Sequence, residues 1–406
     1  MLLEFWISLV SLIFLAVFLG EDFVLKVVYL LVGAYLVGGW WSRKAFANLR
    51  FTRQYNEHTF LHEVIPVRVE VSNQGWLPLV WLKLHESIPP GLSLDKNIQE
   101  VISLGPQGKA QLQYRLYAHR RGYYRIGPLS ASSGDLFGLF NDQRWQDRGS
   151  YLTVYPQIVP LSNVRPPSRS PLGTLRYNQP IYEDPSRIRS KRDYVSGDSL
   201  RRIDWKGSAT VGRLQVKQYE PSIALETSIF LNMHAPEYEQ RRRLDTTELA
   251  VIVAASLATW VSAQKQPVGL ITNGTDPAID PYPGISAGAE LNRIFTPVTP
   301  AKGSGNLMRI LEILARVQVA ETLPAVERLR QEHGKLSWGT TLILICGHMD
   351  EALFDELFQL RRYGLNLFLV LVGRIPGFSS IQTRARYFHF PLYSILNLKD
   401  LDLWRL

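Results

Sequence analysis

The chain has 406 residues, 46% of them hydrophobic, and a formal net charge of +9 at pH 7. This length indicates two or three domains. The single cysteine, Cys346, excludes a disulfide within the chain, and without a CxxC motif or a His and Cys cluster a structural zinc site is not expected. The positive charge suits a surface that faces anionic lipid, whereas aromatic residues are not interleaved with the basic ones as a nucleic-acid platform requires.

Two apolar runs open the chain and predict a hairpin of transmembrane helices. Residues 5–20 carry no charge, and residues 23–41 carry only Lys26, near the start of the run. Each run approaches the ~20 residues that cross a bilayer, and Lys26 can extend toward the interface. A cleaved signal peptide is the rival interpretation, but neither a basic start nor an A-x-A-like site is present. Two helices of a soluble core are the other alternative, although neither run has a polar face.

The charges that flank the two runs predict their orientation. The turn between them holds two acidic residues and no arginine, whereas four basic residues follow the second run: Arg43, Lys44, Arg50 and Arg53. Basic residues flanking a span favour the cytoplasmic side. We therefore expect an inner (plasma) membrane protein with both termini and its soluble domains in the cytoplasm.

From residue 65 the pattern becomes that of an antiparallel β-sandwich. Val67, Val69 and Val71 alternate with polar residues, and turn signals separate several such runs. Arg120 and Arg121 lie at one predicted corner. They are interpreted as solvated arginines of a hairpin, with nucleic-acid contact as the alternative.

After residue 224 the pattern predicts a doubly wound α/β domain. Near-continuous apolar strands alternate with helices, as in a parallel sheet that is covered on both faces. The first long helix is expected to open with a capping box at residues 245–248. The predicted strands are residues 227–231, 268–273, 341–346 and 366–373, and the predicted helices are residues 245–263, 307–317, 324–332 and 351–363.

Ligands of doubly wound folds bind at the carboxyl ends of the strands, so the residues that follow two of the predicted strands are a candidate metal site. His234, His348 and Asp350 could in principle ligate a divalent ion there. The alternative is that these are ordinary polar loop residues, since their spacing is not diagnostic. The sequence contains no phosphate-binding glycine loop, so nucleotide binding is not expected.

The densest concentration of charge, glycine and aromatic residues lies at residues 192–220, which read RDYVSGDSLRRIDWKGSATVGRLQVKQYE. In an enzyme, Asp198 and Asp204 would act as paired carboxylates of a hydrolase or phosphoryl-acting site, but the segment has no histidine and no nucleophile with a partner base. In a structural clasp, these aspartates would pair with neighbouring arginines, Gly197 would supply a turn and Trp205 would be buried.

A binding surface is the third interpretation of this segment. Trp, Tyr and Arg dominate interface hot spots, so the aromatic residues would anchor a partner that the basic residues attract. The binding and clasp interpretations are compatible with each other. The candidate residues are Arg192, Tyr194, Gly197, Asp198, Arg201, Arg202, Asp204, Trp205, Lys206, Arg213 and Lys217.

The segment resembles the signature of the bacterial domain of unknown function 58 family. The resemblance implies two membrane helices, a β-sandwich, this segment and a von Willebrand factor A-like domain. It also implies partnership with MoxR-type AAA+ ATPases in the assembly or activation of other proteins, and no catalytic residue. The matching positions are Arg192, Tyr194, Gly197, Asp198, Arg201, Ile203, Asp204, Trp205, Lys206, Ser208, Ala209, Gly212, Leu214, Lys217 and Glu220.

Two departures from the family pattern stand out. Thr210 follows Ala209 where the family usually has arginine. Von Willebrand A-like domains that bind metal carry Asp-x-Ser-x-Ser after their first strand, but residues 232–236 here read Asn-Met-His-Ala-Pro. Magnesium prefers carboxylate and hydroxyl oxygens, so we expect no metal at this motif and no cofactor.

The sequence patterns predict a membrane anchor and give no support for nucleic acid. The family resemblance implies a non-enzymatic adaptor or scaffold that works with a MoxR-type AAA+ ATPase and an unidentified client protein. The alternative is a hydrolase or phosphoryl-acting enzyme that uses Asp198 and Asp204. The expected parts are the transmembrane hairpin at residues 1–42, the β-sandwich at 43–150, the linker and signature segment at 151–224, and the von Willebrand A-like domain at 225–406.

Overall fold

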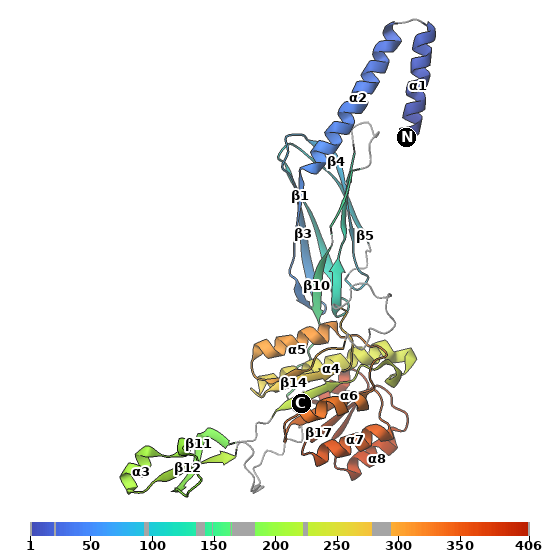
Figure 1. The fold of residues 1–406 in the computed structure, drawn as a ribbon. Coiled ribbons are helices and arrows are strands. Elements are labelled where there is room, and N and C mark those ends of the chain that lie inside the picture. Colours follow the sequence, from blue (N-terminus) through green and yellow to red (C-terminus); the bar gives the residue numbers. More distant parts are fainter. Residues whose placement is uncertain are drawn as a thin grey trace. The chain divides into compact units, whose positions relative to one another are not determined.

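A computed structural model describes most of the chain (Figure 1). The chain divides into two compact units. The first comprises Met1–Gln157, Asp276–Pro283 and Leu311–Val317, and the second Ile158–Thr275, Gly284–Ile310 and Gln318–Leu406. Described are residues 2–19, 22–92, 97–134, 143–147, 149–162, 164, 183–221, 226–277 and 294–404.

The first unit begins with two apolar helices, α1 (Leu2–Leu19) and α2 (Asp22–Ala47), which contact each other. Large apolar side chains point outward from both, including Phe14 (74% exposed) and Tyr29 (71% exposed). At 1.5 Å per residue α2 is about 39 Å long, which exceeds the ~30 Å hydrocarbon core of a bilayer. Its residues Phe23–Ala47 are long and apolar enough to cross a membrane, and α2 is thus a candidate membrane anchor.

The β-rich part of the first unit has antiparallel sheets, as expected. The sheets have the strand orders β1-β3-β6, β2-β10-β7 and β5-β4-β8-β9, and β2 with β10 is a parallel pair. The strands are β1 (Leu49–Gln54), β2 (His58–Phe60), β3 (Val64–Asn73), β4 (Leu79–Ser87), β5 (Asn97–Leu104), β6 (Lys109–Tyr117), β7 (Gly122–Ile126), β8 (Leu129–Ser133), β9 (Gln143–Gln146) and β10 (Ser150–Tyr155).

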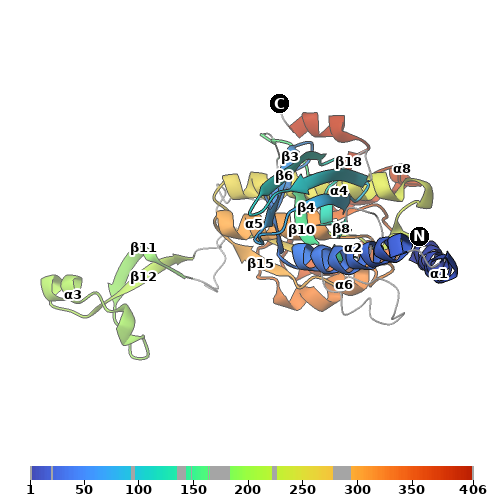
Figure 2. The ribbon, with the colours of Figure 1, turned by 90° about the horizontal axis from the view of Figure 1, so that it is seen from above.

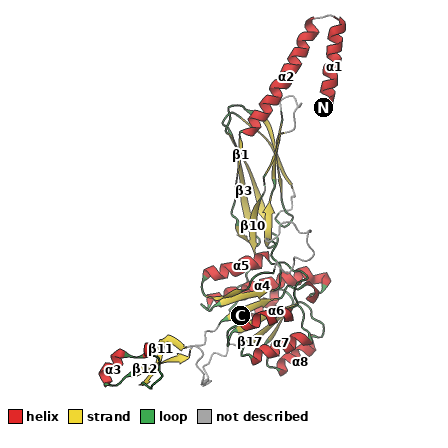
Figure 3. Cartoon of the chain, in the orientation of Figure 1, coloured by secondary structure: helices red, strands yellow, loops and turns green. Residues whose placement is uncertain are grey.

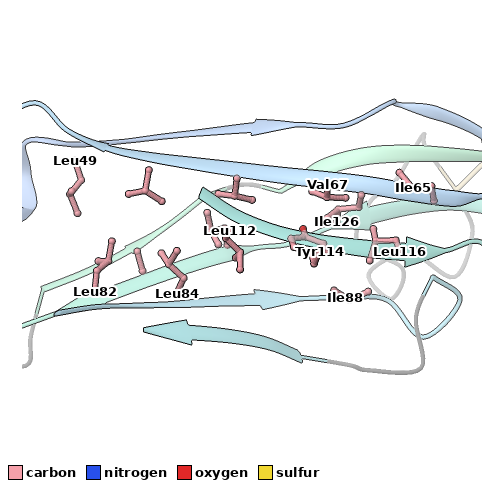
Figure 4. Close-up of a cluster of buried hydrophobic side chains, with 14 of the residues drawn as sticks. Leu49, Ile65, Val67, Leu82, Leu84, Ile88, Leu112, Tyr114, Leu116 and Ile126 are labelled. Atoms are coloured by element: carbon pink, nitrogen blue, oxygen red, sulfur yellow. The ribbon is translucent and has the colours of Figure 1, made fainter. Parts of the chain in front are cut away.

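The predicted alternation of β3 is confirmed by its burial. Val67, Val69 and Val71 are fully buried, and Val69 lies opposite Leu112 of β6. Their side chains join a core that the strands surround, where residues from facing strands point toward one another (Figure 4). Burying apolar side chains contributes about 25 cal/mol per Å² of apolar surface, so this core is the main source of stability in the β-rich part.

An ion pair is buried at the edge of this core. A guanidinium nitrogen of Arg53 lies 2.5 Å from a Glu86 carboxylate oxygen, and the other lies 3.0 Å from Asp147. The same guanidinium donates to the Ser150 hydroxyl at 2.7 Å. The Glu86 side chain is fully buried, and this burial raises its pKa even though Arg53 opposes the shift.

Arg121 departs from the solvated corner that the sequence predicted. Its guanidinium is partly buried and donates to the main-chain carbonyls of Leu314, Ala315 and Val317, which belong to the same unit. These carbonyls lie at the end of α5 (Ser304–Arg316), where carbonyls lack partners within the helix. Arg121 therefore supplies hydrogen-bond donors to the last carbonyls of α5. The sequence could not predict this role, because α5 lies almost 200 residues further along the chain.

The second unit contains a mixed six-stranded sheet of order β15-β14-β13-β16-β17-β18 (Figure 3). The five strands from β14 to β18 in this order are parallel, as predicted, but β15 pairs antiparallel with β14. The strands are β13 (Thr227–Leu231), β14 (Val268–Thr272), β15 (Val298–Ala301), β16 (Thr341–Cys346), β17 (Asn366–Val372) and β18 (Leu392–Ile395).

Helices cover both faces of this sheet. Helices α6 (Ala325–Glu332), α7 (Glu351–Arg362) and α8 (Phe378–Tyr387) share one core cluster with β16 and β17. Helix α4 (Arg243–Ala263) contacts β13, β14, β16 and β17 and contributes nothing to that cluster, so it packs on the other face. Cys346, at the end of β16, is fully buried in this core, and burial raises the pKa of its thiol.

The predicted capping box of α4 is wrong. The helix starts at Arg243, directly after the 3₁₀ turn η3 (Gln240–Arg242), and no side chain caps it. The Thr247 hydroxyl donates instead to the Arg243 carbonyl one turn earlier. A helix that continues from a 3₁₀ turn already has local partners for its first amides, so the Asp-Thr-Thr-Glu pattern falls inside it.

Candidate functional site

The signature segment folds as a β-hairpin with a short helical insertion (Figures 1 and 2). Strand β11 (Glu183–Asp193) pairs antiparallel with β12 (Gln215–Pro221), and the 3₁₀ turn η1 (Leu200–Arg202) and helix α3 (Trp205–Val211) lie between them. Ile203 bridges to Val216, and both side chains are buried. A two-stranded hairpin is marginal by itself, so polar contacts within the insertion matter for its stability.

Asp198 is held by Arg192 in a bidentate ion pair. The two guanidinium nitrogens lie 2.7 and 2.6 Å from the two carboxylate oxygens, and the Val195 amide donates to the same carboxylate at 3.0 Å. These contacts, led by the hydrogen bond from Arg192, lower the pKa of Asp198. Gly197 permits the turn between them because its φ of 107° is one that other residues rarely adopt. The predicted pairing of Asp198 with an arginine is thus present.

Asp204 is also paired, but with a lysine rather than an arginine. Lys191 Nζ lies 2.5 Å from Oδ2 of Asp204, and the hydrogen bonds from Lys191 and from the Gly207 amide lower the pKa of the carboxyl group. A Cβ atom at position 207 would lie 2.6 Å from that same Oδ2, so a larger residue there would push the Asp204 carboxylate away from its place beside Lys191. Lys191 lies on β11, immediately before residues 192–220. It is close to Asp204 only because β11 and β12 pair in this register.

Ser208 joins α3 to β12. Its buried hydroxyl donates to the Asp204 carbonyl at 2.7 Å and accepts a hydrogen bond from the Gln215 amide at 2.8 Å. The helix then ends at Gly212, whose φ of 74° is the left-handed conformation typical of helix ends. In the sequence, Ser208 is one of the positions that match the family signature, and the structure shows that it connects the helix to the strand.

Most of the other large side chains of the insertion are exposed. Trp205 and Leu200 are each 67% exposed, and Val195 is 63% exposed. The predicted burial of Trp205 as a clasp is therefore wrong, because as the first residue of α3 it points to solvent. Arg201, Arg202, Lys206 and Arg213 are exposed as well, whereas Tyr194 and Lys217 are partly buried.

The exposed set (Val195, Leu200, Arg201, Arg202, Trp205, Lys206, Arg213 and Leu214) is called the insertion surface below. It combines large apolar side chains with cations on a segment that can bury few of its own apolar residues. Exposed apolar groups beside polar ones mark interaction sites when they gather on one part of a protein.

The second candidate region lies after β13, where a metal-binding domain of the resembled type carries its motif. The Asn232 amide donates to Glu237 at 2.6 Å, and its side-chain oxygen accepts from the Asn273 amide at 2.8 Å and from the His234 main chain at 3.1 Å. Glu237 also accepts from the Ala325 amide at the start of α6. Side-chain amides and one carboxylate thus fill this strand end with mutual hydrogen bonds.

The three residues considered as metal ligands have separate positions. Asp350 caps α7 by accepting from the Leu353 amide at 2.8 Å, the main chain of His234 bridges to Ala320, and His348 is exposed. Within the described residues no three His, Cys, Asp or Glu side chains gather as a metal site would need.

We expect that Mg²⁺ or Mn²⁺ does not bind tightly at this strand end, because the Glu237 carboxylate already accepts a hydrogen bond from the Asn232 amide. Calorimetric titration of the detergent-solubilised full chain should give no stoichiometric heat. Asn232→Asp, which restores a carboxylate, is the comparison variant. Tight one-to-one binding by the unaltered chain, lost in Glu237→Gln, would contradict this expectation.

The comparisons with known proteins give one sequence relative and weak structural ones. The chain is 25% identical over 232 residues to the uncharacterized protein YeaD of Bacillus subtilis, covering 55% of this chain and 56% of that relative. The CARDB domain of the PF1109 protein from Pyrococcus furiosus is 14% identical, with a TM-score of 0.20, over 26% of this chain and 86% of that domain. The C-terminal domain of wzt is 12% identical, with a TM-score of 0.21, over 27% of this chain and 75% of that one.

A family model identifies the part of the chain that begins in β11. The match starts at residue 190, immediately before Lys191 and Arg192, and includes the whole insertion, β12, β13, α4 and the strand end around Asn232. The resemblance drawn from the signature is therefore confirmed for this part: residues 190–326 match the family described as protein of unknown function DUF58.

Proposed function

We propose that this protein is a membrane-anchored, non-enzymatic adaptor whose insertion surface binds a protein partner. The partner implied by the signature is an AAA+ ATPase of the MoxR type, which would act with this protein in assembling or activating an unidentified client. In this proposal α1 and α2 form the transmembrane hairpin, both soluble units face the cytoplasm, and the second unit is the von Willebrand factor A-like domain. The β-rich part is interpreted as a sandwich that joins the anchor to the chain that follows it.

One contrast within the signature segment carries the proposal. Its two central aspartates are occupied by Arg192 and Lys191, while Trp205, Leu200 and the basic residues of η1 and α3 remain exposed. Trp and Arg are the residues that contribute most to binding at protein interfaces. The cations favour a partner surface that combines acidic residues with an apolar pocket for Trp205.

The enzymatic alternative has weaker support from the same geometry. A general acid or base works best when its pKa lies near the working pH. The pKa values of Asp198 and Asp204 are instead lowered by their ion pairs, which keeps both groups as stable carboxylates. Their oxygens contact Arg192, Lys191 and main-chain amides that build the hairpin, so the adaptor function is the better account.

Reversing two charges of the insertion surface should abolish capture of the ATPase. In the full chain carrying Arg201→Glu and Arg202→Glu, an acidic partner surface would meet like charges, which costs several kcal/mol. The measurement is affinity capture from native membranes, with AAA+ ATPases identified and quantified by mass spectrometry. The unaltered chain should enrich an ATPase of this class, and the double variant should reduce it to background.

The chain offers a closely matched control. Arg241 and Arg242 are also adjacent exposed arginines at the end of a 3₁₀ turn, η3, outside the insertion. Arg241→Glu with Arg242→Glu should leave capture unchanged. Hydrogen exchange of β11 and β12 should be the same in all proteins, which separates loss of binding from loss of fold. Equal capture by the Arg201 and Arg202 variant would rule out this surface as the binding site.

A further inference from the structure

An apolar groove lies within the first unit, between α2 and the first residues of β4. Its cavity volume is about 440 Å³, within the ~300–1,000 Å³ typical of small-ligand sites. On the helix side the groove exists because small residues, Gly33, Ala34 and Gly38, recur at helical spacing. A Cβ atom built on Gly33 would meet nothing within 4 Å, so this position opens directly into free space.

Two features give the groove a defined wall. The indole nitrogen of Trp41 donates to the Pro78 carbonyl at 3.0 Å, which ties α2 to the segment that enters β4. Leu79 follows Pro78 and is 4% exposed, and it lines the groove opposite the helix. The space is therefore bounded by a hydrogen-bonded contact between helix and strand, rather than by a loose loop.

A buried polar atom without a partner points to a missing ligand. Ser42 lines the groove and is only 4% exposed, and its hydroxyl has no hydrogen-bond partner. A helical serine usually donates to the carbonyl four residues earlier, and buried hydroxyls are nearly always satisfied. An otherwise apolar site with one unsatisfied hydroxyl suits a ligand that is mostly hydrocarbon but carries an oxygen.

From this geometry we infer that the groove binds one acyl chain of an anionic glycerophospholipid, with an ester oxygen at Ser42. This inference rests on the proposed insertion of α2 in the membrane. Leu30 and Val37, at the groove, are 69% and 58% exposed, so the site is continuous with the outward apolar surface of α2. Arg43 and Lys44 lie in the same turn of α2 as Ser42, outside the groove lining, and both are exposed. Their long side chains can extend to a lipid phosphate at the interface.

The size of the groove argues against a second transmembrane helix as its occupant. A helix with its side chains is about 10–12 Å wide and rises about 5.4 Å per turn, so 440 Å³ holds only about one turn. Helix pairing in membranes extends over several turns of small residues. A single acyl chain fits this space. A second helix would fit only if Pro78 and Leu79, which line the groove opposite α2, moved away.

The test measures lipid retention by the full chain in nanodiscs of phosphatidylcholine and phosphatidylglycerol. Native mass spectrometry after detergent release should show one retained phosphatidylglycerol. A phosphatidylglycerol with a diazirine in its acyl chain should crosslink to the peptide that contains Trp41 and Ser42. Gly33→Phe places a ring in the groove at a position where the Cβ meets nothing within 4 Å, and it should abolish both signals. Ser42→Ala should weaken retention.

The control variant is Leu36→Phe, which places the same side chain on α2 at a residue that is 63% exposed and lies outside this groove. It should behave like the unaltered chain. Retention that survives in Gly33→Phe, or a crosslink to a second copy of the chain at the groove, would overturn the inference. Alkaline carbonate extraction separates the two failures: release of the unaltered chain refutes membrane anchoring, whereas a chain that stays inserted but retains no lipid refutes only the groove.

Discussion

Replacing Arg53 by leucine should destabilise the β-rich part of the chain by about 3–5 kcal/mol. The substitution leaves the fully buried Glu86 without its cation, and an uncompensated buried charge is far more costly than a missing surface contact. Thermal unfolding of the detergent-solubilised chain, followed by the fluorescence of the tryptophans in this part, would measure the loss. The loss should be larger at pH 8 than at pH 5.

The direction of that pH dependence follows from Glu86. Burial raises its pKa above the ordinary value of 4.5, and removing Arg53 raises it further. A group whose pKa is raised by folding takes up a proton on folding, so its stabilising effect is present at low pH and is lost as the pH rises through the folded pKa. The Arg53→Leu protein therefore recovers stability as the pH falls toward the ordinary pKa of glutamate.

Two further variants separate the buried pair from general effects of charge. Lys109→Leu breaks the exposed pair with Glu70, whose lysine side chain is 70% exposed, and should cost only about 0–1 kcal/mol. Arg53→Leu combined with Glu86→Leu removes both charges and should recover most of the lost stability. If the double variant is as unstable as Arg53→Leu alone, the argument from the unpaired charge fails.

Ser208→Ala should loosen the whole signature hairpin. The change removes the hydrogen bond to the Asp204 carbonyl and leaves the Gln215 amide without its acceptor, a loss of about 1–3 kcal/mol. Among the side chains of this hairpin that the structure describes, only Ile203 and Val216 are buried apolar groups, so a loss of that size is large for it. Hydrogen exchange by mass spectrometry should show faster exchange in β12 and α3, with the sheet of the second unit unchanged.

Thr210→Ala is the matched control for Ser208→Ala. Both side chains lie on α3 and donate to a carbonyl one turn earlier, Thr210 to Lys206 at 3.1 Å, but Thr210 is exposed and accepts nothing from β12. Its removal should leave exchange in the hairpin unchanged. Faster exchange in both variants would mean that α3 is simply frayed. Exchange that is unchanged in both variants would mean that Ser208 does not hold α3 and β12 together.

Much of the fold was predictable because burial leaves a direct pattern. The alternation of Val67, Val69 and Val71 and the apolar run of β16 each reflect which side chains are buried, and both were located correctly. The short strands β15 and β18 were missed because four residues are too few to show a period. The start of α4 was missed because the 3₁₀ turn η3 runs directly into the helix, so the Asp-Thr-Thr-Glu pattern falls inside α4 and not at its start.

The candidate site was only partly predictable. The segment itself and the pair between Asp198 and an arginine could be recognised from composition, because six residues separate the two partners. Lys191 could not be identified as the partner of Asp204, since that contact depends on the register of two strands. The exposure of Trp205 could not be foreseen either, because a tryptophan between an aspartate and a lysine is compatible with a clasp or with an anchor.

The burial of Cys346 makes the molecule convenient for site-specific labelling. Its thiol is fully buried and has a raised pKa, so it presents little of the thiolate that reacts with maleimides. A cysteine introduced at an exposed position, such as Trp205→Cys, would then react alone in an otherwise native chain. Spin or fluorescent probes could report on the hairpin in a lipid bilayer without first removing the native thiol.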